Sequence, residues 1–307
     1  MVQTSLWGID SHGIARLPHY LERLSRGSIV AQPVMQFEQT AAATGSVDGG
    51  HGLGYLVCSF AMKHAISLAR DAGVGIVGVR NSSHCGAIGL YTRQAAESGM
   101  IGIAFTHSDS FVAPYGGTRA FFGTNPISVA IPSADERRPL CLDMATSVVP
   151  FNKIANARQE NQPVDPGYGI DQNGRPTTNP HEIAALNPMA QHKGYAMAFI
   201  IDMLCGPLNG MPFGPHIAPM YDQLDQTREL GSLMIAFDPA RFGGGATLRD
   251  SVGTAITEVK RQGDHVLFPG EPEYLSEIAR TRDGIPVEPG LRAEISRWAQ
   301  RLGLSSP

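Results

Sequence analysis

The chain has 307 residues, of which 42% are hydrophobic and 17% charged, with a formal net charge of −4 at pH 7. This composition is typical of a globular protein, and the mixed acids and bases form no basic patch of the kind that nucleic acids require. The N-terminus lacks the basic start and apolar run of a secretory signal, and no apolar run approaches the roughly 20 residues that cross a bilayer. We therefore expect a cytoplasmic protein with no nucleic-acid or membrane partner.

The four cysteines are scattered and form no CxxC pair, which fits reduced thiols better than a disulfide framework. The ten histidines show no HxxxH or HExxH spacing, so we expect no metal site.

Helices and strands alternate along most of the chain. Pro18 suits the first turn of a helix over 18–25, which Gly27 ends. Apolar periodicity and short apolar runs then predict, in chain order, a helix over 55–71, a strand over 74–79, a helix over 88–98 and strands over 101–106, 127–131 and 139–144.

The second half begins with a long loop over 159–180, which is rich in Pro, Gly, Asn and Asp. The most apolar segment, 192–205, predicts a buried helix. The pattern then predicts a strand over 232–237 and helices over 272–282 and 289–302. Strands that alternate with helices indicate an α/β fold.

The glycines of 73–78 match the GxGxxG pattern, but their context argues against a Rossmann site. That fingerprint needs a strand before it and a helix opening on it. Here a helix precedes the glycines, and they fall inside the apolar strand run. We interpret them as part of a tightly packed strand.

Three polar clusters stand out. The first cluster contains His12, Arg16 and Tyr20, which are spaced four residues apart. An Arg beside a His and a Tyr suits a carboxylate-binding site, but the same mixture is also common on a surface turn. His84 follows a predicted strand and precedes a helix, where α/β folds place ligand-binding residues; a structural histidine is the alternative. The third cluster, 106–109, leads into Gly-rich turns at 114–117 and 123–126, which either approach a phosphate or are simply tight turns.

Seven strings in this chain, in this order, resemble the malate/L-lactate dehydrogenase family. They are SHGIARLPHYLERL, VRNSSHCGAIG, PYGGTRAFFGTNP, CLDMATS, GIDQNGRPTTNP, HKGYAMAFIIDMLCG and LFPGEPE. An eighth string, MYDQLDQTRELGSL, looks most like the ureidoglycolate-oxidising branch of that family. The resemblance covers about residues 11–273.

The resemblance implies hydride transfer between a nicotinamide dinucleotide and C2 of a small 2-hydroxy or 2-oxo acid. His84 matches the family's catalytic acid/base, and we expect Asp143 to orient His12 through a hydrogen bond, with Ser11 in the same network. Substrate-pocket positions match Ser11, His12, Arg16 and Tyr20, and Arg228 matches an arginine of the ureidoglycolate branch that assists Arg16. Cofactor-contacting positions match Ser108, Asp143, Met144, Ala145, Lys193, Gly270, Glu271 and Pro272.

The family's fold is a non-Rossmann α/β arrangement. By this resemblance we expect an α/β dinucleotide-binding domain over 44–218, packed with a mainly helical domain built from 1–43 and 219–307. Family members form intertwined homodimers with the active site near the subunit boundary. They usually carry further helices before the SHG motif, so we expect core and dimer packing to differ here.

The substrate stays open among malate, lactate, sulfolactate and ureidoglycolate, which differ beyond C2. We favour NAD over NADP only through the ureidoglycolate resemblance. Two alternatives remain. One is a reductase of a cyclic imino acid, which the same family contains, and the other is a non-catalytic binding protein on the same fold.

Overall fold

The protein is built around a seven-stranded sheet, seen in a computed structural model that describes residues 1–135 and 138–305. The strand order is β1-β2-β3-β9-β4-β5-β6. In sequence order these are β1 (Gln36–Ala41), β2 (Thr44–Gly52), β3 (Val74–Ser82), β4 (Ile101–Thr106), β5 (Ile127–Ile131), β6 (Leu140–Met144) and β9 (Leu230–Phe237). Within this sheet β2 and β3 run parallel and the other neighbouring pairs are antiparallel. A short hairpin, β7 (Gly169–Ile170) with β8 (Ala185–Leu186), lies apart.

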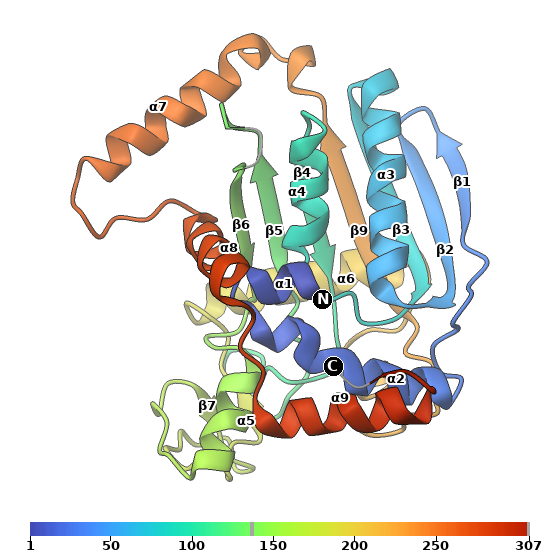
Figure 1. The fold of residues 1–307 in the computed structure, drawn as a ribbon, viewed down its shortest axis with the longest axis vertical. Coiled ribbons are helices and arrows are strands. Elements are labelled where there is room, and N and C mark those ends of the chain that lie inside the picture. The colour runs from blue at the N-terminus through green and yellow to red at the C-terminus, as the bar shows by residue number, and fades with distance from the viewer. Residues whose placement is uncertain (136–137, 306–307) are drawn as a thin grey trace.

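Helices cover both faces of the sheet. In Figure 1, α3 (Gly54–Ala72) and α4 (Gly89–Glu97) lie in front of the strands, and α6 (His192–Cys205) lies behind them. The main core forms between α3, α4 and the sheet, where Val57, Met62, Val77 and Met234 are fully buried. Burial of each such side chain stabilises the fold by about 1.5–3 kcal/mol.

The two chain ends contribute helices that pack on each other. Helix α1 (Val2–Leu6) contacts α8 (Glu271–Asp283), and α2 (Leu17–Ser25) contacts α9 (Pro289–Arg301). Helix α5 (Phe151–Glu160) lies near the hairpin, whereas α7 (Leu248–Lys260) stands away from the body (Figure 1). No residue of α7 is buried.

The glycines of the rejected GxGxxG pattern lie where strand β3 packs against α3. Gly73 ends α3 with a φ of 84°, a left-handed conformation that favours glycine. A Cβ on Gly75 would lie 2.0 Å from the backbone oxygen of Ala65 on α3. Glycine is therefore needed here for close helix–strand packing, which confirms that this is not a dinucleotide loop.

The predicted α/β class is confirmed, and every helix and strand predicted from the pattern is present within three residues at each end. Among the described residues, seven helices and strands were not predicted: α1, β1, β2, α5, β7, β8 and α7. Helix α6 was expected to be buried, but it exposes Phe199 and Ile200 on one side. The segments 1–43 and 219–307 are not purely helical, because they supply β1 at the sheet edge and β9 at its centre.

Candidate functional site

A cavity of about 430 Å³ lies at one edge of the sheet. Strands β3, β4 and β6 end at this edge, and β5 and β9 begin there because they run antiparallel to their neighbours. The loops after β3 and β4 line the cavity with His84 and Ser108, and the last residues of β6 add Asp143. Its size lies within the roughly 300–1,000 Å³ range of small-molecule sites.

His84 shares a hydrogen bond with Tyr20 of α2. The Tyr20 hydroxyl lies 2.6 Å from His84 Nδ1, which leaves Nε2 as the other ring nitrogen. Burial, followed by the nearby His12 and Arg228, holds the pKa of His84 well below its usual 6.5, so the imidazole is neutral near pH 7. Burial also raises the pKa of Tyr20 well above 10, so its phenol keeps its proton. Tyr20 does not line the cavity and contacts His84 instead, so its expected role in the substrate pocket stays a prediction.

His12 stacks on His84 with ring centroids 5.4 Å apart. Its Nδ1 lies 2.9 Å from Ser11 Oγ, as expected for a shared network. Burial, followed by the charge of Arg16, lowers the pKa of His12 to about 4. The expected hydrogen bond from Asp143 is wrong: Asp143 instead accepts from the N–H of Gly89 (2.7 Å), because β6 ends beside the first turn of α4.

Arg16 is the cationic group of the cavity. It donates to the backbone oxygen of Ser11 (2.7 Å), to the Tyr221 hydroxyl (2.7 Å) and to Asn152 Oδ1 (2.8 Å). A guanidinium has five N–H donors, so one N–H on each terminal nitrogen remains. All three acceptors are uncharged, and no carboxylate of the described residues pairs with Arg16. The arrangement suits a carboxylate ligand.

Buried arginines fasten the loop 218–229 that brings Tyr221 to Arg16. Arg23 is 1% exposed and donates to the backbone oxygens of Pro219 and Met220 at 3.0 and 2.8 Å. Arg228 donates to Ala218 O (3.1 Å) and pairs with Asp109. Arg228 does not line the cavity, although its charge acts on His84, so its expected assistance to Arg16 stays a prediction.

The predicted cofactor residues divide into two groups. Ser108, Asp143, Met144 and Ala145 line the cavity. Lys193 is exposed on α6, and Glu271 at the start of α8 pairs with Lys260 and accepts from the N–H of Phe268. Neither Lys193 nor the 270–272 turn lines the cavity, so their roles stay predictions.

The cavity also contains residues that the sequence analysis missed. Asn152 and Tyr221 reach Arg16 from 136 and 205 positions further along the chain. Glu273 reaches the cavity from the first turn of α8, two residues after the predicted Glu271. Asn152 lies on the unpredicted helix α5. Glu273 and Tyr221 lie inside the strings LFPGEPE and MYDQLDQTRELGSL, which could have marked them, but neither was predicted as a site residue.

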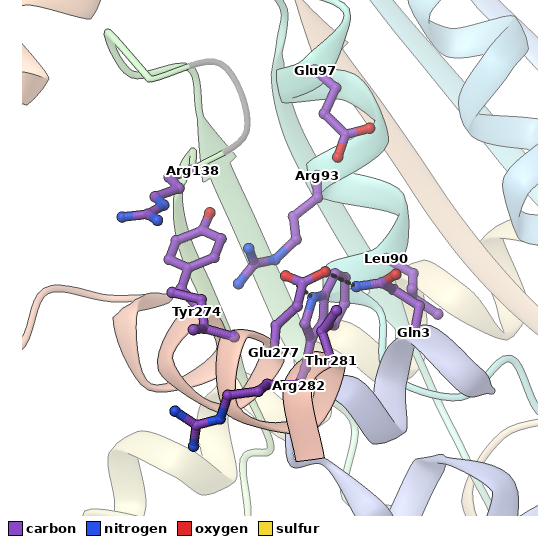
Figure 2. Close-up of a pocket in the computed structure, with 11 residues that line it drawn as sticks. Gln3, Leu90, Arg93, Glu97, Arg138, Tyr274, Glu277, Thr281 and Arg282 are labelled. Atoms are coloured by element: carbon purple, nitrogen blue, oxygen red, sulfur yellow. Dashed lines mark hydrogen bonds between the residues drawn. The ribbon is translucent and has the colours of Figure 1, made fainter. Parts of the chain in front are cut away.

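A second cavity, of about 990 Å³, lies between α1, α4 and α8 and shares no lining residue with the first. In Figure 2, Arg93 extends from α4 toward α8. Its guanidinium lies 4.5 Å from the ring centre of Trp7 and 4.8 Å from that of Tyr274. Glu277 accepts from Gln3 Nε2 (2.7 Å) and Trp7 Nε1 (3.3 Å). These contacts anchor α8 beside the first cavity.

The sequence matches known proteins over nearly its whole length. A family profile described as malate/L-lactate dehydrogenase matches residues 1–296. The malate/(S)-sulfolactate dehydrogenase of Methanothermus fervidus is 36% identical over 99% of this chain and 89% of its own length. The NAD(+) ureidoglycolate dehydrogenase of Escherichia coli is 34% identical over 94% of this chain and 83% of its own length.

Solved structures agree with these relatives. The sulfolactate dehydrogenase of Methanocaldococcus jannaschii superposes with a TM-score of 0.92 and 32% identity over 99% of this chain and 89% of that one. The delta1-piperideine-2-carboxylate reductase of Pseudomonas syringae superposes with a TM-score of 0.87 and 29% identity over 97% and 89%. No helix of the described ranges is both long enough and apolar enough to cross a membrane.

Proposed function

Because this chain belongs to the malate/L-lactate dehydrogenase family, we propose that it is an oxidoreductase that moves a hydride between NAD or NADP and C2 of a small 2-hydroxy or 2-oxo acid. The observation that carries the proposal is one cavity that holds both a neutral, buried His84 and Arg16. The first is neutral near pH 7 and so can accept a proton, and the second can bind a carboxylate.

The cavity fits the nicotinamide end of such a cofactor. Apolar side chains such as Ile88, Phe111 and Met144 line it beside a small number of polar groups. The buried Oε2 of Glu273 has no hydrogen-bond partner in the described part of the chain, so it can accept from hydroxyl or amide donors of a ligand. Ser108, Asp143, Met144 and Ala145 would hold the cofactor.

When bound, the nicotinamide supplies the hydride acceptor or donor, and the chain's own residues handle the proton and the orientation. Arg16 binds the substrate carboxylate and so directs C2 toward His84. In oxidation, Nε2 of His84 takes the hydroxyl proton, which requires that Nδ1–H donate to the Tyr20 oxygen. In reduction, Nε2 returns the proton. Tyr20 fixes the ring and its tautomer.

The finer assignment is ureidoglycolate as substrate with NAD as cofactor. It is supported by the resemblance of 220–233 to the ureidoglycolate branch and by the 34% identity to the NAD(+) ureidoglycolate dehydrogenase. Malate and sulfolactate remain in the same proposal, because both carry the 2-hydroxy acid that Arg16 and His84 would recognise.

The second candidate function is reduction of a cyclic imino acid. The close superposition on the piperideine-2-carboxylate reductase supports it. A cyclic imino acid has a carboxylate beside a C=N bond, so Arg16 and His84 could serve it with the same chemistry. Comparing reduction of a 2-oxo acid with that of piperideine-2-carboxylate separates the two.

We also propose a cytoplasmic homodimer. Two features support a partner subunit. Helix α6 exposes the apolar side chains of Phe199 (42%) and Ile200 (59%). Helix α7 projects away from the sheet, and none of its residues is buried (Figure 1). Light scattering on the purified protein tests this assembly, and a monomer at micromolar concentration would contradict it.

The deciding experiment is oxidation of NADH and NADPH by the purified protein against a panel of 2-oxo acids, with ureidoglycolate tested in the reverse direction. Strong turnover of one acid with one cofactor is the expected result. His84→Ala should then lower kcat by roughly 10²–10⁴-fold, the usual contribution of a general acid/base. His265→Ala, at an exposed histidine after α7, is the control. Unchanged turnover in His84→Ala would remove His84 from the mechanism.

A further inference from the structure

The His84 cavity is lined by groups of opposite charge. The charged groups that act on His84 are Arg16 and Arg228, together with the imidazoles of His12 and His19. Two carboxylates also line the cavity, Asp143 from β6 and Glu273 from α8. Glu273 acts electrostatically on Asp143, so the two carboxylates are neighbours.

These carboxylates have few partners of their own. Among residues 1–135 and 138–305, Asp143 accepts one hydrogen bond, from the N–H of Gly89. Glu273 makes no ion pair there, and its Oε2 is buried without a hydrogen-bond partner. Buried carboxylates are normally paired, because desolvation of an uncompensated charge is costly. An acidic pair left in this state indicates a ligand with positive charge or hydrogen-bond donors.

Contacts on either side of Glu273 anchor the helix α8 that carries it. The Tyr274 hydroxyl, next to Glu273, donates to Pro139 O at 2.9 Å, and Arg93 covers the Tyr274 ring. One turn further along α8, Glu277 is held by Gln3 and Trp7 (Figure 2). Burial and the charge of Glu273 together raise the pKa of Asp143 to about 6. The N–H of Gly89 and the charge of Arg93 offset part of this effect at Asp143, and a positively charged ligand would offset more.

We propose that Asp143 and Glu273 form an acidic subsite that binds the positively charged, oxidised nicotinamide group in preference to its neutral, reduced form. The inference rests on the proposed function. The two carboxylates would repel an anionic substrate, which Arg16 attracts, so the oxidised cofactor is the bound group whose charge matches the pair. Glu273 becomes a specificity-determining residue for the redox state of the cofactor.

The test measures nucleotide binding without substrate. For wild type and Glu273→Gln, the Kd of NAD+ is measured by calorimetry and that of NADH by fluorescence. We expect the Kd of NAD+ to rise about tenfold, equivalent to about 1.4 kcal/mol, while that of NADH changes less than about twofold. Asp283→Asn removes an exposed carboxylate from the far end of the same helix, outside this cavity, and should leave the ratio of the two Kd values unchanged.

Two results would overturn the inference. One is an equal change, or no change, in both Kd values. The other is a lower melting temperature with an unchanged Kd ratio, which would make Glu273 only a first-turn acid that stabilises the N-terminus of α8. If Glu273→Gln does not fold, Asp143→Asn must raise the ratio in the same direction for the inference to stand. A wild-type protein that binds neither NAD(H) nor NADP(H) would instead refute the proposed function itself.

Discussion

Removing the Tyr20 hydroxyl tests whether the orientation of His84 controls the chemistry. Tyr20 is 1% exposed, and its hydroxyl lies 2.6 Å from Nδ1 of His84. In Tyr20→Phe the ring and its packing remain, but Nδ1 becomes an unpaired polar atom in a buried site. Such a loss costs about 1–3 kcal/mol.

That free energy corresponds to a fall in kcat of roughly 5- to 150-fold, since about 1.4 kcal/mol is a factor of ten. The KM for the acid should change little, because Tyr20 does not line the cavity and the contacts of Arg16 are untouched. The assay is steady-state oxidation across pH 6–9 with the best acid from the substrate panel.

Tyr274→Phe is the matched control. Tyr274 is 5% exposed, and its hydroxyl donates to a backbone oxygen outside the His84 cavity. It should lose a similar amount of stability with little effect on kcat. A Tyr20→Phe enzyme with wild-type kcat, or one in which only KM rises, would refute the assignment of Tyr20 as the positioning partner of His84.

Three further predictions concern the charged groups of the cavity. Arg16→Gln should lower kcat/KM for the acid about 10- to 150-fold, mainly through KM, because a charge-assisted hydrogen bond is lost; saturation kinetics check this. Asp143 has a folded pKa of about 6 against a usual 3.8, so its carboxylate lowers stability as pH rises from about 4 to 6. Asp143→Asn should therefore be more stable by up to about 3 kcal/mol above pH 6 and no more stable below pH 4, as urea unfolding would show. His12 has a folded pKa of about 4 against a usual 6.5, so the folded protein loses stability as the pH falls from 6.5 to 4. Over that range, the free energy of unfolding of His12→Gln should fall by about 3 kcal/mol less than that of wild type, as thermal melts would show.

The elements that could be predicted are those whose own residues determine them. The apolar runs of β4 and β5 and the apolar segment of α6 have the predicted bounds. Strand β2 was missed because Gly45, Gly49 and Gly50 give it almost no strand propensity. It exists because β1 and β3 pair with it on either side, which is a property of the tertiary structure.

The same distinction applies to the site. His84 was predicted from its place after a strand, and Arg16 from the polar cluster around it, because both signals are local. Their hydrogen-bond partners are distant in the sequence: Tyr20 contacts His84 across 64 positions, and Tyr221 contacts Arg16 across 205. The expected contact between Asp143 and His12 failed because the end of β6 lies beside α4, which the sequence pattern does not reveal.

Strand β9 explains how this fold builds a cofactor-sized cavity without a Rossmann turn. It pairs antiparallel with both β3 and β4, so it separates the His84 loop from the 106–108 loop by two strand spacings, about 10 Å. Because β9 is antiparallel to both, it begins at the cavity edge, and the loop that precedes it must cross that edge. This loop, 218–229, carries Tyr221, which accepts from Arg16 in the cavity, and it is also held by Arg23 of α2 and by Arg228 within the loop. Substitutions in 218–229 that spare Arg228 should therefore alter the choice of acid while leaving the affinity for the nucleotide unchanged, because the residues proposed to hold the nucleotide lie on other segments.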